Sequence, residues 1–142
     1  FIDRMLPRVE PFIELRDGRC RYPVRGVAKE RKMVLVSNCG FWEMENFDPL
    51  IVHMKAFCEN ASFDYAGALL RPHGVALPEM IKMGMSPNDI FEAAKDAGRQ
   101  LISEGKMKQE TLDIVGRDLL PKNMYLQMAN QEAKKELEAL GK

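Results

Sequence analysis

Two short apolar runs, separated by about one helix length, constrain the fold of this chain more than any other feature. Residues 33–36 read Met-Val-Leu-Val, and residues 65–70 read Tyr-Ala-Gly-Ala-Leu-Leu. Continuous apolar runs of this length are typical of strands buried on both faces of a parallel sheet. The segment between them predicts a helix that begins at Asn46 or Asp48, because Pro49 is tolerated in a first helical turn. Its apolar face is expected to contain Leu50, Met54, Phe57 and Ala61.

A strand, a helix and a second strand in about 40 residues form a βαβ unit, in which the strands are parallel and the crossover is right-handed. Both strands then end at the same edge of the sheet. We therefore expect the loops 37–46 and 71–76 to lie side by side, at the edge where open α/β sheets bind their ligands.

The flanking segments are predicted to be mostly helical. Residues 1–13 have apolar side chains near helical spacing, although Pro7 and Pro11 should interrupt the helix. No capping residue precedes Phe1, which predicts that the natural chain begins earlier. Residues 16–32 form a polar connector with a net charge of plus five, expected to be a loop.

Downstream of the second strand the sequence predicts three further helices. Ser86 resembles an N-cap for the first, which is expected to end near Gly105. Its apolar face would consist of Ile90, Phe91, Ala94, Ala97, Leu101 and Ile102. The other two helices are expected over residues 111–115 and 121–139, with a mostly charged, solvated C-terminal end.

Composition narrows the class of protein. The chain has 142 residues, 46% of them apolar, and its 21 basic and 21 acidic side chains cancel. This predicts one globular α/β protein and argues against nucleic-acid binding, which usually needs a strongly basic surface. No apolar run approaches the about 20 residues of a membrane span, and no leader peptide is recognisable. The three cysteines form no close pairs, so we expect reduced thiols, no metal site and a cytoplasmic location.

The segment that follows the first strand, residues 37–43, reads Ser-Asn-Cys-Gly-Phe-Trp-Glu. It combines small polar residues, a glycine and two neighbouring aromatic residues at the predicted ligand edge. Backbone N–H groups and an aromatic face suit a flat ring with polar edges. The alternative is that Phe41 and Trp42 simply cover the end of the sheet.

Four other features each allow two interpretations. Cys39 could be a nucleophile with His73 as its base, but ordinary packing is favoured. Arg71 could face a phosphate or belong only to a turn. The basic connector 16–32 could meet an acidic partner or be solvated. The methionines of the next segment could fill the core or form a subunit interface: Met80, Met83 and Met85.

Three segments of the chain resemble flavodoxin-like NAD(P)H-dependent FMN reductases: FIDRM, KMVLVSNCGFWEMENFDPL and YAGALLRPHG. Iron–sulfur flavoproteins and multimeric flavodoxins are the nearest kin. The resemblance covers residues 1–105 and corresponds to the later half of the FMN-binding domain, while residues 106–142 form a helical C-terminal extension.

This resemblance implies a five-stranded flavodoxin-like parallel sheet with flanking helices, of which this chain lacks the first strands and the phosphate-binding loop. Residues 1–6 would continue the third helix. It also implies FMN as cofactor and NAD(P)H as co-substrate, with electrons passing to a quinone, a free flavin or an iron–sulfur centre. The implied flavin contacts are Ser37, Asn38, Cys39, Gly40, Phe41 and Trp42.

Departures from this family, together with features of the residues themselves, leave two rival functions open. A strand edge left unpaired by the missing strands is a liability unless another chain covers it, which predicts a homo-oligomer. The same edge, together with the methionines and the missing phosphate loop, also fits a non-enzymatic assembly module. A thiol enzyme that uses Cys39 is the weaker third hypothesis.

Overall fold

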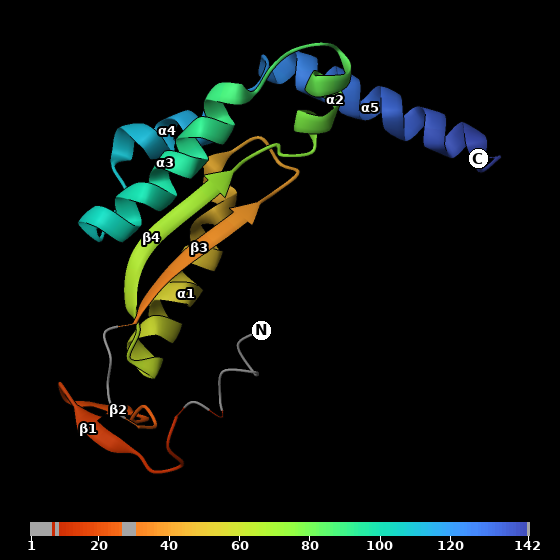
Figure 1. The fold of residues 1–142 in the computed structure, drawn as a ribbon. Coiled ribbons are helices and arrows are strands. Elements are labelled where there is room, and N and C mark those ends of the chain that lie inside the picture. Colours follow the sequence, from red (N-terminus) through yellow and green to blue (C-terminus); the bar gives the residue numbers. More distant parts are fainter. Residues whose placement is uncertain (1–6, 8, 27–30, 142) are drawn as a thin grey trace.

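The computed structural model describes residues 7, 9–26 and 31–141 (Figure 1). The predicted helix over 1–13 lies partly outside this range. Residues 9–13 are described and are not helical, and Val9 forms an antiparallel bridge with Val24. The elements in chain order are β1 (Glu14–Arg16), β2 (Arg19–Arg21), β3 (Lys32–Asn38), the 3-10 helix η2 (Met44–Phe47), α1 (Asp48–Ala61), β4 (Asp64–Arg71), α2 (Ala76–Lys82), α3 (Asn88–Glu104), α4 (Gln109–Gly116) and α5 (Lys122–Ala139).

Strands β3 and β4 pair in parallel and form the centre of the molecule, as predicted from the two apolar runs. Their register places Val34 beside Gly67 and Ser37 beside Leu70, with an irregularity after Met33. The coarse α/β class is therefore correct. The flavodoxin-like sheet is not confirmed, because the described residues contain a parallel sheet of two strands.

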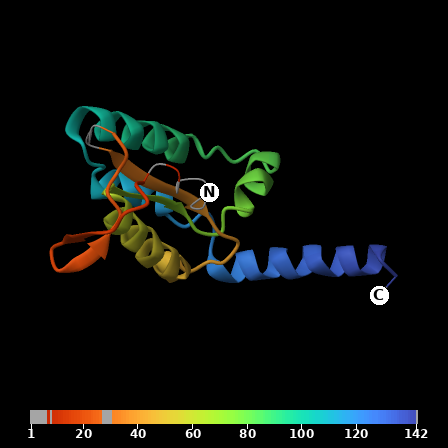
Figure 2. The same ribbon diagram turned by 90° about the horizontal axis from the view of Figure 1, so that it is seen from below.

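Helix α1 connects the two strands and lies on one side of the sheet, while α3 lies on the other (Figure 2). Helix α1 has a proline in its first turn, and its C-cap is Ser62, which adopts a left-handed conformation. The predicted helix is confirmed, and its apolar face is confirmed in part. Met54 and Ala61 are buried as predicted, together with Cys58, whereas Phe57 is half-buried and Leu50 is exposed.

The prediction that the first strand is buried on both faces is wrong. In β3 the exposed positions Val36 and Asn38 alternate with partly buried ones, and Val36 is 71% exposed. The cause is incomplete cover of one face: α3 and α4 pack mainly on β4, whereas α1 contacts both strands. Side chains of a strand point alternately to the two faces, so every second residue of β3 lies on the face that these helices leave open.

The sequence predicts a loop over the connector 16–32, but part of this connector belongs to a β-hairpin. β1 and β2 are antiparallel, with the turn residues Asp17 and Gly18 at φ angles of 50° and 73°. Two successive positive φ angles define the hairpin turn that Asp-Gly favours, so the dipeptide was the overlooked signal. The hairpin lies near the amino ends of β3 and β4 (Figure 1).

The downstream helices agree with the predictions in position and differ in detail. In α3 the N-cap is Pro87, and no side chain caps the helix, so the Ser86 assignment is wrong. Ile90, Ala93 and Ala97 are its buried residues, whereas Phe91 and Ile102 are exposed. Helix α2 was not predicted.

A hydrophobic cluster joins α2, α3 and the α4–α5 linker: Ala76, Met80, Ile90, Leu119 and Leu120. Tyr125 and Met128 of α5 pack against this cluster, and the rest of α5 extends away from the body (Figures 1 and 2). All of α5 is described, and none of its residues is buried. Of the three methionines considered as core or interface residues, Met80 is core, while Met83 and Met85 are exposed.

Candidate functional site

The loops after β3 and β4 lie side by side, as predicted from the parallel topology. The amide of Cys39 donates to the carbonyl of Arg71 at 3.1 Å, and the amide of Gly74 donates to the carbonyl of Cys39 at 2.9 Å. The amide of His73 donates to the carbonyl of Phe41 at 2.7 Å. These three hydrogen bonds fasten the loop 39–43 to the turn 72–75.

The six predicted flavin contacts fall into an outward group and an inward residue. Ser37 and Asn38 end β3 and line an open pocket of about 450 Å³ on the sheet, with Leu69, Arg71 and Val115 among its other walls. Gly40 is exposed and Phe41 is 69% exposed. The partly buried Cys39 thiol donates to the Phe41 carbonyl at 3.4 Å.

Trp42 turns inward and stacks on His73, with ring centroids 4.1 Å apart and planes 12° apart. Tyr125 of α5 lies 5.7 Å from both rings. Its hydroxyl donates to the carbonyl of Gly40, and Lys122 pairs with Glu43. The loop is therefore held by α5 as well as by β4. No sequence pattern indicated the role of Tyr125, because its partners are distant in the chain.

Arg71 is buried and caps the C-terminal end of α4. Its guanidinium donates to the carbonyls of Val115 at 2.6 Å and Gly116 at 3.3 Å, and also to that of Arg117. Burial, followed by the nearby Arg117 side chain, lowers the pKa of Arg71 to about 10, so it stays charged at neutral pH. A cation at these carbonyls is favourable because the last carbonyls of a helix are unpaired. The alternative in which Arg71 faces a phosphate is not supported, because its donors are engaged.

His73 is the most enclosed polar side chain in the described structure, at 0% exposure. Its Nε2 accepts a hydrogen bond from the amide of Leu119 at 3.0 Å. An accepting Nε2 requires the proton to be on Nδ1, which has no hydrogen-bond partner among the described residues. Burial and then the Arg71 charge lower the pKa of His73, so the ring is neutral at neutral pH.

This geometry gives little support to a thiol enzyme. The Cys39 thiol is hydrogen-bonded to its own loop, and Nε2 of His73 is occupied by the Leu119 amide. A nucleophilic cysteine needs a base within hydrogen-bond reach, and none contacts Cys39 in the described part of the chain.

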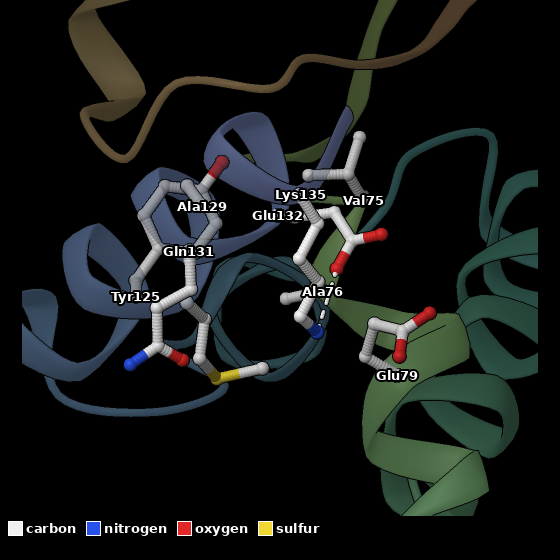
Figure 3. A pocket seen from close by; sticks show the side chains of 9 residues that line it. Val75, Ala76, Glu79, Tyr125, Ala129, Gln131, Glu132 and Lys135 are labelled. Atoms are coloured by element: carbon white, nitrogen blue, oxygen red, sulfur yellow. Dashed lines mark hydrogen bonds and ion pairs between the residues drawn. The ribbon is translucent and has the colours of Figure 1, made fainter. Parts of the chain in front are cut away.

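A second pocket, of about 360 Å³, lies between α2 and α5 (Figure 3). Ala76 and Glu79 line it from α2, and Tyr125 lines it from α5. At its rim Lys135 and Glu132 form an ion pair at 3.4 Å. The pocket thus adjoins the point where α5 begins to leave the body.

Within residues 7, 9–26 and 31–141, no cluster of three or more histidine, cysteine or acidic side chains is placed to hold a metal ion. No helix in the same ranges is long and apolar enough to cross a membrane. Comparisons with protein-family models, curated proteins and solved structures found no match. The structure therefore contains a small parallel α/β unit, and the loop after β3 carries the aromatic residues Phe41 and Trp42.

Proposed function

We propose that the loop 37–42 is part of a flavin site, and that the protein is an FMN-dependent NAD(P)H oxidoreductase. The observation that carries this proposal is the outward loop at the carboxyl end of β3, with an exposed aromatic ring beside an open pocket. The volume of this pocket, about 450 Å³, is in the usual range for small-molecule sites. On this proposal Ser37, Asn38, Cys39, Gly40 and Phe41 contact the ring system, and Trp42 supports the loop from behind.

The residues present fit a polar-edged planar ring. Among the hydrogen bonds between described residues, the amides of Gly40, Phe41 and Trp42 donate none, so they are available to ring heteroatoms. The Phe41 side chain can cover a ring face. When bound, FMN would accept a hydride from NAD(P)H and pass electrons to a quinone, a flavin or an iron–sulfur centre. The chain itself would bind and orient the ring.

The phosphate end of FMN needs donors from elsewhere, because Arg71 is committed to α4. We propose that a further segment or a second copy of the chain supplies them, in a cytoplasmic homo-oligomer. The open edge of β3 is consistent with such a neighbour.

An FMN titration tests the proposal. Saturable quenching of flavin fluorescence by the full chain is expected, with a parallel change in Trp42 emission. Phe41→Ala should weaken binding about tenfold, the equivalent of 1.4 kcal/mol for a stacked aromatic contact. Phe12→Ala is the matched control, because Phe12 is a similarly exposed phenylalanine outside the loop. A folded chain that leaves flavin fluorescence unchanged would contradict the proposal.

The second candidate is an assembly module without flavin chemistry, favoured by the exposed Val36 on β3, whose second edge pairs with no described strand. It predicts association in light scattering that Val36→Lys abolishes, because an edge lysine opposes strand addition. Val52→Lys is the control, since Val52 is similarly exposed but lies on α1. A monodisperse monomer would count against this candidate.

A further inference from the structure

His73 is the point where three separate parts of the chain meet. Its amide donates to Phe41 in the loop after β3, its Nε2 accepts from Leu119 in the α4–α5 linker, and its ring stacks on Trp42. Its own backbone has a positive φ of 40°, which is uncommon for a residue other than glycine. A residue held in this conformation by contacts on several sides is placed by its surroundings with little freedom.

We propose that neutral His73 is the positioning residue of the loop 39–42, and that its protonation releases Trp42 and the α4–α5 linker. The assignment of this loop to a flavin rests on the proposed function, but the hold on Trp42 does not.

The physical basis is the hydrogen bond at Nε2. A proton added there turns the acceptor into a donor, so it faces the N–H of Leu119, and the bond is lost. The Leu119 amide then has no acceptor, although Leu119 is buried in the hydrophobic cluster. Leaving a buried donor unpaired is unfavourable, so protonation favours movement of the linker away from His73. Tyr125 of α5 follows this linker and packs on Trp42, so movement of the linker also uncovers the indole ring.

The charges around His73 oppose a proton on the ring. Arg71 lies on β4, with Nη2 3.4 Å from Nε2 of His73, and its charge disfavours the imidazolium. Asp118 in the linker and the backbone of Trp42 act in the opposite direction and more weakly. Burial and Arg71 together place the pKa of His73 below its ordinary value of 6.5. Tyr125 of α5 faces the ring edge, and Arg117 and Cys39 lie beside Arg71.

The direction of the pH effect follows from the lower pKa of His73 in the folded chain. The unfolded chain takes up the proton near pH 6.5, and the folded chain only at lower pH. Folded stability is therefore complete above pH 6.5 and declines as the pH falls toward the lower pKa of the folded state. Release of Trp42 is expected in the same window.

The chain provides its own reporter, because Trp42 is its one tryptophan, and its two histidines are His53 and His73. Trp42 emission is followed from pH 8 to pH 5 in the absence of flavin, with far-UV circular dichroism to monitor the helices. A red shift with a midpoint below pH 6.5 is expected, at constant helical signal. His53→Gln is the matched control, because His53 is exposed, and its titration should match that of the wild type.

Two variants distinguish a positioning role of His73 from a general structural role. In His73→Gln the amide oxygen can accept from Leu119 but cannot be protonated, so the native emission should persist across the whole pH range. In His73→Leu no acceptor remains, and the emission should be red-shifted at every pH. The same acid transition in wild type and His73→Gln would overturn the proposal, as would emission that changes only with global unfolding.

Nuclear magnetic resonance of the wild-type imidazoles keeps the test valid if a variant fails to fold. The ring nitrogens of His73 should report a proton on Nδ1 and titrate below the ordinary value of 6.5. Titration of His73 at or above pH 6.5 would overturn the proposal.

FMN affinity is measured as a separate part of the test. If FMN binds at pH 8, lowering the pH should weaken the FMN affinity of the wild type about fivefold or more and leave that of His73→Gln unchanged. If FMN does not bind at pH 8, the flavin proposal fails while the Trp42 transition still tests His73.

Discussion

At the scale of single residues, two polar side chains form hydrogen bonds to distant segments that their positions in the sequence do not indicate. Arg71 ends a strand, yet its guanidinium caps a helix more than 40 residues downstream. His73 lies two residues further along the chain and accepts a hydrogen bond from the linker that follows the same helix. Both are buried, so their polar atoms depend on partners within the protein. Such roles require the folded chain and cannot be recognised in a local pattern.

Replacing Arg71 tests the helix cap. Arg71→Met keeps an unbranched side chain of similar length but leaves the last carbonyls of α4 without donors. We expect the free energy of unfolding to fall by about 3 kcal/mol, measured by urea denaturation.

The control for Arg71→Met is Arg99→Ala. Arg99 is an exposed arginine that pairs with Asp96 within α3, and its loss should change stability by less than about 0.5 kcal/mol. Equal effects of the two substitutions would contradict the assignment of Arg71 as a cap.

At the scale of elements, β4 contains a backbone position that only glycine occupies easily. Gly67 has a φ of 120° just after the irregularity in the β3–β4 register. A Cβ there would lie 3.0 Å from Cε of Met107. The glycine in the apolar run 65–70 thus marks a bend in the strand, as glycine within a strand often does.

The substitution Gly67→Ala is expected to lower the free energy of unfolding by about 1 to 3 kcal/mol, through strain at this φ. Gly98→Ala should act in the opposite direction. Gly98 lies inside α3, where a Cβ meets no atom within 4 Å, and alanine is better than glycine in a helix by about 1 kcal/mol. Thermal unfolding of both variants beside the wild type measures the difference. A stabilising Gly67→Ala would show that the strand does not bend there.

At the scale of the whole molecule, α5 is divided into an attached part and a free part. Tyr125 and Met128 pack on the hydrophobic cluster, and the Tyr125 hydroxyl reaches the loop after β3. Beyond them the helix has no buried side chain, and five of its last eleven residues are charged. A helix without burial gains little from tertiary packing.

Shortening α5 tests this division. A chain that ends after residue 130 should have a free energy of unfolding within about 0.5 kcal/mol of the full chain, because only exposed residues are removed. Tyr125→Ala should cost about 1 to 3 kcal/mol, because it removes the ring contacts and the hydrogen bond to Gly40. A large loss in the shortened chain would mean that the end of α5 is packed against something in solution.

Local sequence signals were enough to predict the parallel strand pair, the helix that connects the two strands and the approximate ends of α3, α4 and α5. These follow from local signals: two continuous apolar runs, Pro49 in a first helical turn and Gly105 after a last one. The same signals predicted that the loops after both strands meet at one edge, because parallel strands end together.

Which surfaces remain open and which side chains meet depends on contacts that form only in the folded chain. The exposure of Val36 depends on where α3 and α4 pack on the sheet, and the inward turn of Trp42 depends on His73 and Tyr125. These contacts join residues distant in sequence, and burial, hydrogen bonding and charge decide among them once the chain is compact. Periodicity and propensity act over a few residues and are insensitive to such partners.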